Sequence, residues 1–335
     1  MTEILLPGTK LYFERSNDLA RATQYTVVAA AHRGEIVPLV SVRANRVVKW
    51  ILKDLYPNAD AIVPEWRHGR SRFDFLVTDS SSNTVVEAKS CSLSEYGVAM
   101  FPDAPTIRGH RHIVELAELT QRRDTRLSAR VIFLITHGKP ERFIPHVHTD
   151  PDFALSLHEA AEHIDIDAFS VQFDSNGRVV NDVLRVPVDT TLAADLAKRN
   201  GGIYLLILSV QACRIQVGGL GEVHFETGFY VYVGSAVRNL KQRISRHLRK
   251  RKKNHWHIDY LVSRATKTNA YPIFTYHDLE CELARGVRDV ASEEIRRFGS
   301  SDCDCPSHLF YFESNPLEAK TFVDLLLMYR HRRAF

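Results

Sequence analysis

The sequence predicts a mixed α/β (α+β) protein that is built from two consecutive modules. The first 190 residues alternate β-branched runs with segments of helical periodicity, a pattern typical of sheets covered by helices. A second series of apolar, strand-like runs begins at the pair Gly201-Gly202. The length of 335 residues also suits two domains, because one domain typically has about 100–200 residues.

Strand and helix signals follow one another through the first module. Residues 24–42 predict a β-hairpin that turns at Arg33-Gly34, and residues 43–56 predict a helix that ends at Pro57. The further predicted elements are strands at 72–78 and 84–89, a helix at 109–124, a strand at 130–136, a helix at 151–163, and strands at 167–173 and 183–188. The predicted domains are a β segment at 1–42, an α/β domain at 43–190, a linker at 191–200 and a second α/β domain at 201–335.

Composition indicates an ordinary globular chain. Hydrophobic residues make up 44% and charged residues 25%, with a net charge of +4. No apolar run reaches the roughly 18 residues that span a bilayer, and the first residues lack the pattern of a signal peptide. We therefore expect a cytoplasmic protein without a membrane partner, whose five cysteines are reduced thiols or metal ligands.

A pattern of acids and a lysine in the first module suggests metal-dependent phosphodiester chemistry. Asp74 precedes the triplet Glu87-Ala88-Lys89 in a D-x₁₂-E-x-K pattern, and both ends lie in strand-like runs. Mg²⁺ is held by one or two carboxylates and by phosphate oxygens, and a nearby ammonium group orients the attacking water. The bare pattern is common, so solvated charges at strand ends are the alternative.

The motifs around this pattern resemble those of the sugar fermentation stimulation protein (SfsA) family. They are EILLPG, SRFDF, VVEAKS, AMFPDAPTIRGHRH and DPDFALSLHEAAEHIDIDAFS, all between residues 1 and 190. The resemblance implies a DNA-binding protein with an OB-like N-terminal part and a PD-(D/E)XK nuclease-like domain. It assigns Asp74, Glu87 and Lys89 to the catalytic site, and it adds Glu65 to Asp74 and Glu87 as a metal ligand.

Two departures from the family pattern concern the triplet and the N-terminus. The triplet reads EAK here, whereas the family usually has EVK. Family members also have residues before the ELL motif, so we expect the OB-like segment at 1–42 to be partial.

Two stretches of the chain suggest contacts with nucleic acid. Eight of the thirteen residues from Lys241 to Lys253 are Lys or Arg and none is acidic, which favours polyanion contact over a solvated helix face. Arg108 lies at the start of a predicted helix, where it either contacts phosphate or pairs with Asp103. The predicted nucleic-acid contacts are Arg72, Arg108, Arg246, Arg249, Lys250, Arg251, Lys252 and Lys253.

The second module resembles the GIY-YIG nuclease superfamily over residues 200–335. Gly202-Ile203-Tyr204 lies in the strand-like run GIYLLILSV, and Tyr232-Val233-Gly234 lies in GFYVYVGSA. The strings HWHIDYL, ECELA and SDCDCPSHLFYF follow in the order of one branch of the superfamily. The two tyrosines are farther apart than is typical, because residues 214–227 are predicted to add a hairpin.

Phosphodiester cleavage needs a positioned water, a cation against the phosphate and a metal at the leaving oxygen. Each tyrosine taken alone is more often a packing residue, but the ordered set of motifs favours a site. The predicted catalytic residues are Tyr204 and Tyr232 for the water, Arg243 for the phosphate, His247 as proton shuttle, and Glu280, with Glu282 as the alternative, for Mg²⁺ or Mn²⁺.

A third group of residues has the composition of a zinc site. Cys281, Cys303, Cys305 and His308 would provide three thiolates and an imidazole for a closed tetrahedral Zn²⁺ site. The C-x-C-x₂-H spacing is tighter than that of a common zinc knuckle, and free cysteines also pack as small hydrophobes. The sequence leaves both interpretations open.

Three classes of function remain. The first is a DNA-binding endonuclease, a hydrolase that uses Mg²⁺ or Mn²⁺ in two nuclease-type modules. The second is a non-specific DNA-binding regulator of sugar (maltose) metabolism genes with weak or no nuclease activity, and the third is an RNA-processing factor. The acids favour the enzyme, because a protein that only binds nucleic acid has no need of carboxylates that face phosphate.

Overall fold

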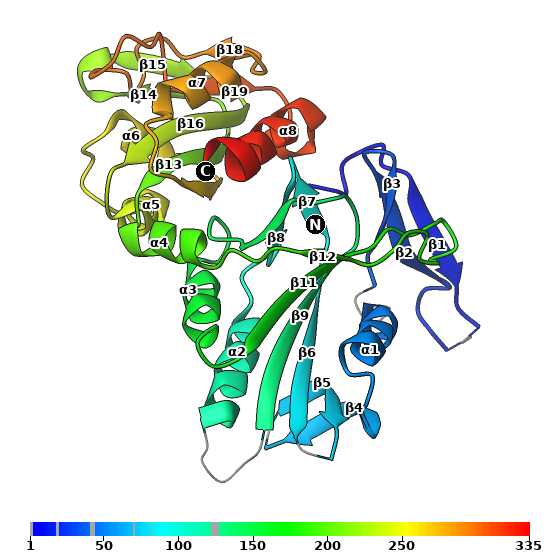
Figure 1. Cartoon of the computed structure of the whole chain (residues 1–335). Helices are drawn as coiled ribbons and strands as arrows, with labels where there is room; N and C mark the ends of the chain where they lie inside the picture. Colours follow the sequence, from blue (N-terminus) through cyan, green and yellow to red (C-terminus); the bar gives the residue numbers. More distant parts are fainter. Residues whose placement is uncertain (1–2, 18–19, 41–43, 70, 81, 122–126) are drawn as a thin grey trace. The chain divides into compact units, whose positions relative to one another are not determined.

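The computed structural model describes residues 3–17, 20–40, 44–69, 71–80, 82–121 and 127–335. The chain divides into two compact units, unit 1 (Met1–Asp195) and unit 2 (Leu196–Phe335). Each unit mixes helices and strands, which confirms the predicted fold class (Figure 1). The expected linker at 191–200 is largely helix α4 (Thr191–Arg199), and the two units divide inside it. Among the described residues, no helix is both long enough and apolar enough to cross a bilayer.

Unit 1 is organised around a mixed sheet that has six strands among the described residues, in the order β12-β11-β9-β6-β5-β4. The pairs β6/β9 and β9/β11 are parallel, and antiparallel strands continue the sheet on both sides. The strands are β4 (Ala61–His68), β5 (Ser71–Thr78), β6 (Asn83–Cys91), β9 (Leu127–Ile135), β11 (Asp165–Ser170) and β12 (Leu184–Val186).

Two smaller sheets of unit 1 have three strands each within the described residues. The antiparallel sheet β1-β2-β3 forms the N-terminal segment that was expected to be OB-like, and its hairpin turns at Arg33-Gly34 as predicted. The second sheet has the order β10-β8-β7. Their strands are β1 (Leu11–Arg15), β2 (Tyr25–His32), β3 (Glu35–Pro38), β7 (Leu93–Glu95), β8 (Val98–Phe101) and β10 (Arg142–Pro145).

The helices of unit 1 cover both faces of the central sheet. Successive strand side chains point to opposite faces, so Val86 of β6 packs with helix α1 (Ala44–Leu55), whereas Val85 packs with α2 (Ile107–Gln121) and α3 (Pro151–Ala160). Glu87 has the same parity as Val85 and therefore faces α2. The predicted helix at 109–124 starts earlier, at Ile107, and its last predicted residues lie outside the described part of the chain.

Unit 2 contains an antiparallel sheet with the order β17-β13-β16-β19-β18, five strands among the described residues. The predicted extra hairpin is confirmed as the pair β14/β15. The strands are β13 (Gly202–Val210), β14 (Cys213–Gln216), β15 (Glu222–Phe225), β16 (Gly228–Ala236), β17 (Lys267–Phe274), β18 (Glu293–Glu294) and β19 (Leu309–Phe312). The helices are α5 (Leu240–Leu248), α6 (His257–Val262), α7 (Glu280–Arg288) and α8 (Lys320–Met328).

Alternation along β13 decides which side chains reach the core of unit 2. Ile203 and Leu205 pack with Leu283 of α7 and Leu326 of α8. Tyr204 lies between Ile203 and Leu205 in the sequence, so its side chain points to the other face of the sheet. There its hydroxyl contacts His247 of α5.

Candidate active sites

The predicted residues of the first site lie around one polar cavity of unit 1. The cavity has a volume of about 400 Å³ and lies beside β5 and β6. Its walls include all of the predicted catalytic and metal-binding residues of this domain. The polar and charged lining residues are Asn45, Glu65, Arg72, Asp74, Glu87, Lys89, Ser90 and Arg108.

Glu87 has one oxygen with partners and one without. Its Oε1 lies 2.6 Å from Lys89 Nζ and 2.7 Å from His112 Nδ1. Its Oε2 is buried and has no hydrogen-bond partner. Burial acts to raise the pKa of Glu87, but the hydrogen bond from His112 and the charge of Lys89 outweigh it and hold this pKa below its usual value. An ionised carboxylate that lines a cavity and has one unpaired oxygen fits a divalent cation.

Asp74 is held by two donors. Its Oδ1 accepts from Asn45 Nδ2 at 2.8 Å, and its Oδ2 accepts from the Ala88 backbone N–H at 2.9 Å. Burial and the neighbouring Glu87 carboxylate raise the pKa of Asp74. A cation between the two carboxylates would offset the repulsion that raises the pKa of Asp74.

Glu65 lines the same cavity but is oriented differently. Its side chain is 69% exposed, and its carboxylate lies 3.4 Å from Arg72 Nη1. Its backbone has a left-handed φ of 56°. Glu65 therefore lacks the fixed orientation of Asp74 and Glu87.

Two supporting residues of this site were missed in the sequence. His112 is 1% exposed, and its Nδ1 lies 2.7 Å from Glu87 Oε1. Its spacing from Gly109 and Leu116 on the buried stripe of α2 was the available signal. Asn45 follows residues that the structure does not describe, and no sequence pattern marks it.

Four of the five predicted catalytic residues of unit 2, all except His247, line a second cavity, which has a volume of about 230 Å³. Tyr204 comes from β13, Tyr232 from β16, Arg243 from α5 and Glu280 from α7. The Arg243 guanidinium donates to the Ser235 carbonyl at 2.7 Å and lies 5.1 Å from the centre of the Trp256 ring. Four separate elements thus position one polar site.

His247 is buried and contacts Tyr204 directly. The Tyr204 hydroxyl lies 2.9 Å from His247 Nε2, and the Asp259 carboxylate lies 3.5 Å from Nδ1. Burial lowers the pKa of His247 to about 4 and raises the pKa of Tyr204 well above its usual value. At neutral pH the neutral imidazole therefore accepts a hydrogen bond from the protonated phenol.

The glycine of the YVG motif makes room for Tyr204. A Cβ added at Gly234 would lie 2.5 Å from both Cζ and the hydroxyl oxygen of Tyr204. This is too close for a side chain of any kind. The close approach of β16 to the ring explains why a glycine stands at this position.

The structure distinguishes the two candidate acids on α7. Glu280 Oε2 accepts from Ser235 Oγ, and Oε1 lies 3.0 Å from His308 Nδ1. Burial acts to raise the pKa of Glu280, but these hydrogen bonds outweigh it and lower this pKa. Glu282 instead pairs with Arg333 at 2.6 Å, away from the cavity-lining residues. The geometry favours Glu280.

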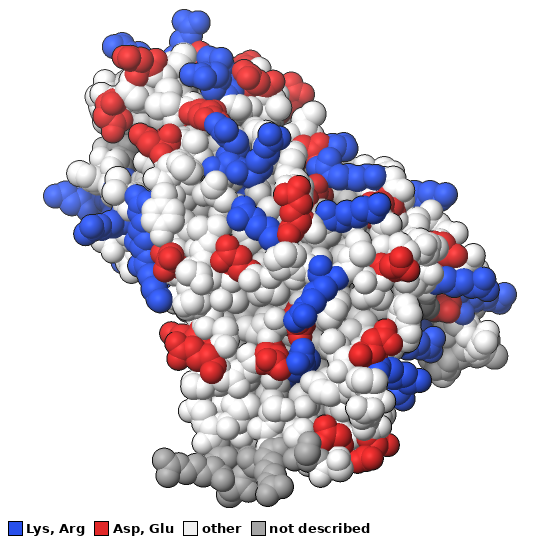
Figure 2. Space-filling view, in the orientation of Figure 1, with Lys and Arg blue, Asp and Glu red and all other residues white. Residues whose placement is uncertain are grey.

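The basic residues between Lys241 and Lys253 fall into two groups, partly buried and exposed. Arg246 and Lys252 lie 3.0 and 3.1 Å from the fully buried Asp259. The Lys252 side chain is 8% exposed, so its predicted role as a phosphate contact is corrected to a structural one. The basic residues that remain exposed are Arg249, Lys250, Arg251 and Lys253. Elsewhere, basic and acidic side chains are interspersed over the face drawn in Figure 2.

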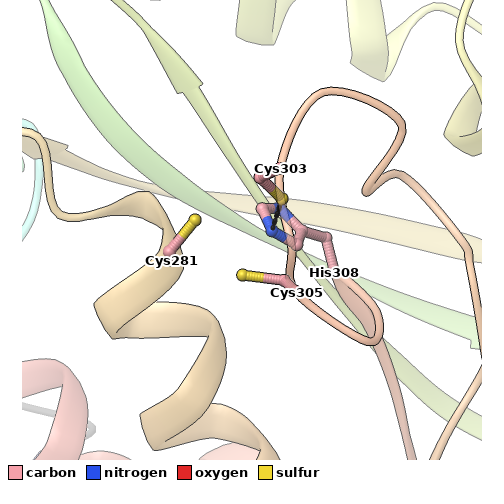
Figure 3. A group of neighbouring side chains, drawn as sticks. All are labelled: Cys281, Cys303, Cys305 and His308. Carbon is pink, nitrogen blue, oxygen red and sulfur yellow. Dashed lines mark hydrogen bonds between the residues drawn. The ribbon is translucent and has the colours of Figure 1, made fainter.

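The predicted zinc ligands also come together. The ligand atoms of Cys281, Cys303, Cys305 and His308, the thiolate cluster, all lie within 4.8 Å of one another. Cys281 belongs to the first turn of α7, and the other three come from the loop that leads into β19 (Figure 3). This cluster is able to hold a metal ion.

Fold and sites define a class of protein: two mixed α/β domains, each with its own polar cavity lined by carboxylates and basic groups. Residues 42–177 match the model described as Sugar fermentation stimulation protein RE domain, and residues 203–329 match Domain of unknown function DUF123. The chain belongs to the sugar fermentation stimulation protein family and carries a GIY-YIG-like DUF123 domain after its SfsA domain.

The similar proteins that follow align with the SfsA part of this chain. The sugar fermentation stimulation protein homologue of Clostridium kluyveri is 33% identical over 190 residues, 55% of this chain and 81% of the homologue. The homologue of Thermotoga petrophila is 36% identical over 172 residues, 51% and 74% respectively. The structure of Pyrococcus furiosus SfsA in complex with Ca²⁺ is 30% identical, with a TM-score of 0.50 over 56% of this chain and 81% of that one.

Proposed function

We propose that the chain is a DNA endonuclease that depends on Mg²⁺ or Mn²⁺ and has one phosphodiesterase site in each domain. The observation that carries the proposal is the convergence of Tyr204, Tyr232, Arg243 and Glu280 from four elements onto one cavity. Carboxylates repel phosphate unless a cation lies between them. A site that sets an ionised carboxylate beside an arginine therefore suits metal-assisted hydrolysis better than simple binding.

In unit 2, Arg243 binds the phosphate, since Trp256 and the Ser235 carbonyl hold its guanidinium in place. The Tyr204 oxygen accepts a proton from the attacking water while its own proton passes to His247 Nε2. Glu280 would hold a divalent ion, which would supply charge stabilisation at the leaving oxygen.

In unit 1, Asp74 and Glu87 hold the ion, and the unpartnered Glu87 Oε2 supports this assignment. Lys89 keeps Glu87 ionised and orients the water. A divalent ion held by these carboxylates would supply charge stabilisation at the phosphate. The proposed metals are Mg²⁺ or Mn²⁺ at both carboxylate sites and a structural Zn²⁺ at the thiolate cluster.

The proposed partner is DNA. Arg72 and Arg108 line the first cavity, and Arg249, Lys250, Arg251 and Lys253 are exposed in unit 2. Because such contacts release counterions, binding should weaken steeply as salt rises.

A substrate panel tests the proposal. Purified full-length protein is incubated with single-stranded, duplex and branched DNA and with RNA, in Mg²⁺, Mn²⁺ or EDTA. We expect cleavage of at least one DNA form that stops in EDTA. Cleavage of RNA alone would assign an RNA-processing role. Binding of DNA without any cleavage would favour a regulator of sugar metabolism genes, in line with the name of the relatives.

A further inference from the structure

We propose that Zn²⁺ held by the thiolate cluster positions Glu280 through His308, so that a structural metal supports the second candidate active site. The role of Glu280 rests on the proposed function. The presence of zinc and its effect on Glu280 do not rest on the proposed function. Both are measured separately from cleavage.

The ligand set and its geometry fit zinc. A tetrahedral ion with bonds of about 2.3 Å to sulfur and about 2.0 Å to nitrogen spaces these ligands roughly 3.5–3.8 Å apart. Cys303 Sγ and His308 Nε2 already lie 3.3 Å apart, and all four ligand atoms are within 4.8 Å. Three thiols and an imidazole, with no oxygen ligand among them, favour zinc over Mg²⁺ or Ca²⁺.

Packing of free cysteines does not explain the cluster. Cys91 shows what a core cysteine looks like in this protein, because it is 1% exposed among apolar side chains. Cys281, Cys303 and Cys305 are only half-buried and line an open cavity of about 440 Å³. Thiols that converge at the surface without filling a core are typical of a metal site.

His308 connects this cluster to the active-site acid. It is 2% exposed, with Nε2 towards Cys303 and Nδ1 3.0 Å from Glu280 Oε1. A metal-binding histidine usually donates its other N–H to a carboxylate, which fixes its tautomer and its orientation. With zinc on Nε2, the proton stays on Nδ1 and holds the Glu280 carboxylate.

The backbone provides a second link. Cys281 directly follows Glu280 in the first turn of α7. A metal on Cys281 therefore fixes the start of the helix that carries Glu280, while His308 fixes its side chain. Ser235 Oγ holds the other carboxylate oxygen, so each oxygen of Glu280 has its own hydrogen-bond partner.

Metal content is the first measurement. We expect full-length protein purified under reducing conditions to contain zinc in equal amount to protein, by mass spectrometry of the metals. Cys305→Ser should lose it, and Cys213→Ser, which alters a cysteine outside the cluster, should keep it. Protein that takes up no zinc on reconstitution, or that holds iron with visible absorbance, would overturn the proposal.

The link to Glu280 is tested with His308→Cys. This variant keeps four zinc ligands but removes the N–H that holds Glu280. All proteins carry Glu87→Gln, so that Mn²⁺ binding followed by EPR reports unit 2. We expect zinc to remain and the Mn²⁺ affinity to fall about 10–100-fold, as is usual when a group that hydrogen-bonds to a metal ligand is lost.

Zinc removal gives the same test without a substitution. Chelation of zinc from the Glu87→Gln protein should weaken Mn²⁺ binding, and zinc readdition should restore it. An Mn²⁺ affinity that does not change with His308→Cys or with zinc removal would contradict the link. If Mn²⁺ binding follows zinc but no substrate is cleaved, the proposed nuclease function fails and the link stands.

Discussion

At the scale of one residue, the two carboxylate oxygens of Glu87 have different surroundings. The protein satisfies one carboxylate oxygen twice and leaves the other buried without a partner. A buried acceptor without a partner costs about 1–3 kcal/mol. A cation bound to Glu87 Oε2 would remove this cost, because it would give the oxygen a partner.

Replacing this acid should weaken metal binding at the proposed first site. In a Glu280→Gln background, we expect Glu87→Gln to lower the Mn²⁺ affinity at least about 10-fold, because a neutral amide is a poor ligand for a hard cation. Isothermal titration calorimetry measures the affinity. The control is Glu118→Gln, the same change at an exposed position of α2. Equal affinities in the two variants would remove Glu87 from the site.

The proposed role of Tyr204 in cleavage depends on its hydroxyl group rather than on its ring. Tyr204→Phe should reduce cleavage by unit 2 by about 100-fold, since it removes the group that takes the proton of the water. Tyr230→Phe is the matched control, because Tyr230 is also buried but donates to the Glu226 carbonyl outside the cavity. Rates are measured in an Asp74→Ala background. If both variants cleave equally well, the ring alone is needed.

His247 makes the stability of unit 2 depend on pH. Its pKa falls from 6.5 to about 4 on folding, so the folded state binds fewer protons than the unfolded state between these values. Its contribution to the free energy of unfolding is present above pH 6.5 and is lost as the pH falls towards 4. The loss amounts to about 3 kcal/mol.

Urea denaturation at pH 7 and pH 4.5 measures this dependence. We expect His247→Gln to lose less stability than the wild type between the two pH values. His224→Gln, at an exposed histidine of β15, should behave as the wild type does. An identical pH dependence in all three proteins would show that His247 is not buried in its neutral form.

The proposed catalytic side chains could be predicted from the sequence, but the residues that hold them could not. Asp74, Glu87, Tyr204 and Glu280 stand in motifs whose spacing is local. Asn45, His112 and Ser235 act through contacts that join distant segments. Such pairings depend on tertiary packing, which a single sequence does not display.

At the scale of elements, the segment after α5 contains two kinds of lysine. Lys252 pairs with the buried Asp259, and Lys250 is exposed. Lys252→Ala should destabilise unit 2 by about 1–3 kcal/mol, because it removes a partner of the buried Asp259 carboxylate. Lys250→Ala should leave stability unchanged and lower the slope of log affinity against log salt by about 0.9. Thermal melting and fluorescence anisotropy measure the two effects. The reverse assignment would contradict the geometry.

Amphipathic helices and apolar strands were predicted well, whereas short or polar elements were missed. The helix at 43–56 carries a clear apolar stripe and matches α1. Strand β4 contains Pro64 and exposed polar residues, so its alternation was hidden. Helix α4 was taken as a linker although Ala193, Leu196 and Ala197 lie at helical spacing and are buried.

At the scale of the whole molecule, the chain consists of two domains, and separate family models match them. This composition could be predicted because each family's motifs are contiguous strings. The sequence could not predict whether the cysteines can bind metal, because that depends on how far their side chains are buried and how close the four ligand atoms lie. Each domain has its own core and its own cavity, so we expect each site to be silenced independently.

The most direct test of the two-site proposal compares four full-length proteins on one DNA substrate with Mn²⁺: wild type, Asp74→Ala, Tyr204→Phe and the double variant. We expect cleavage by the wild type, a partial loss in each single variant and none above background in the double variant, while DNA binding stays nearly unchanged. Cleavage by the double variant at the wild-type rate, or a wild type that cuts no DNA, would contradict the proposal.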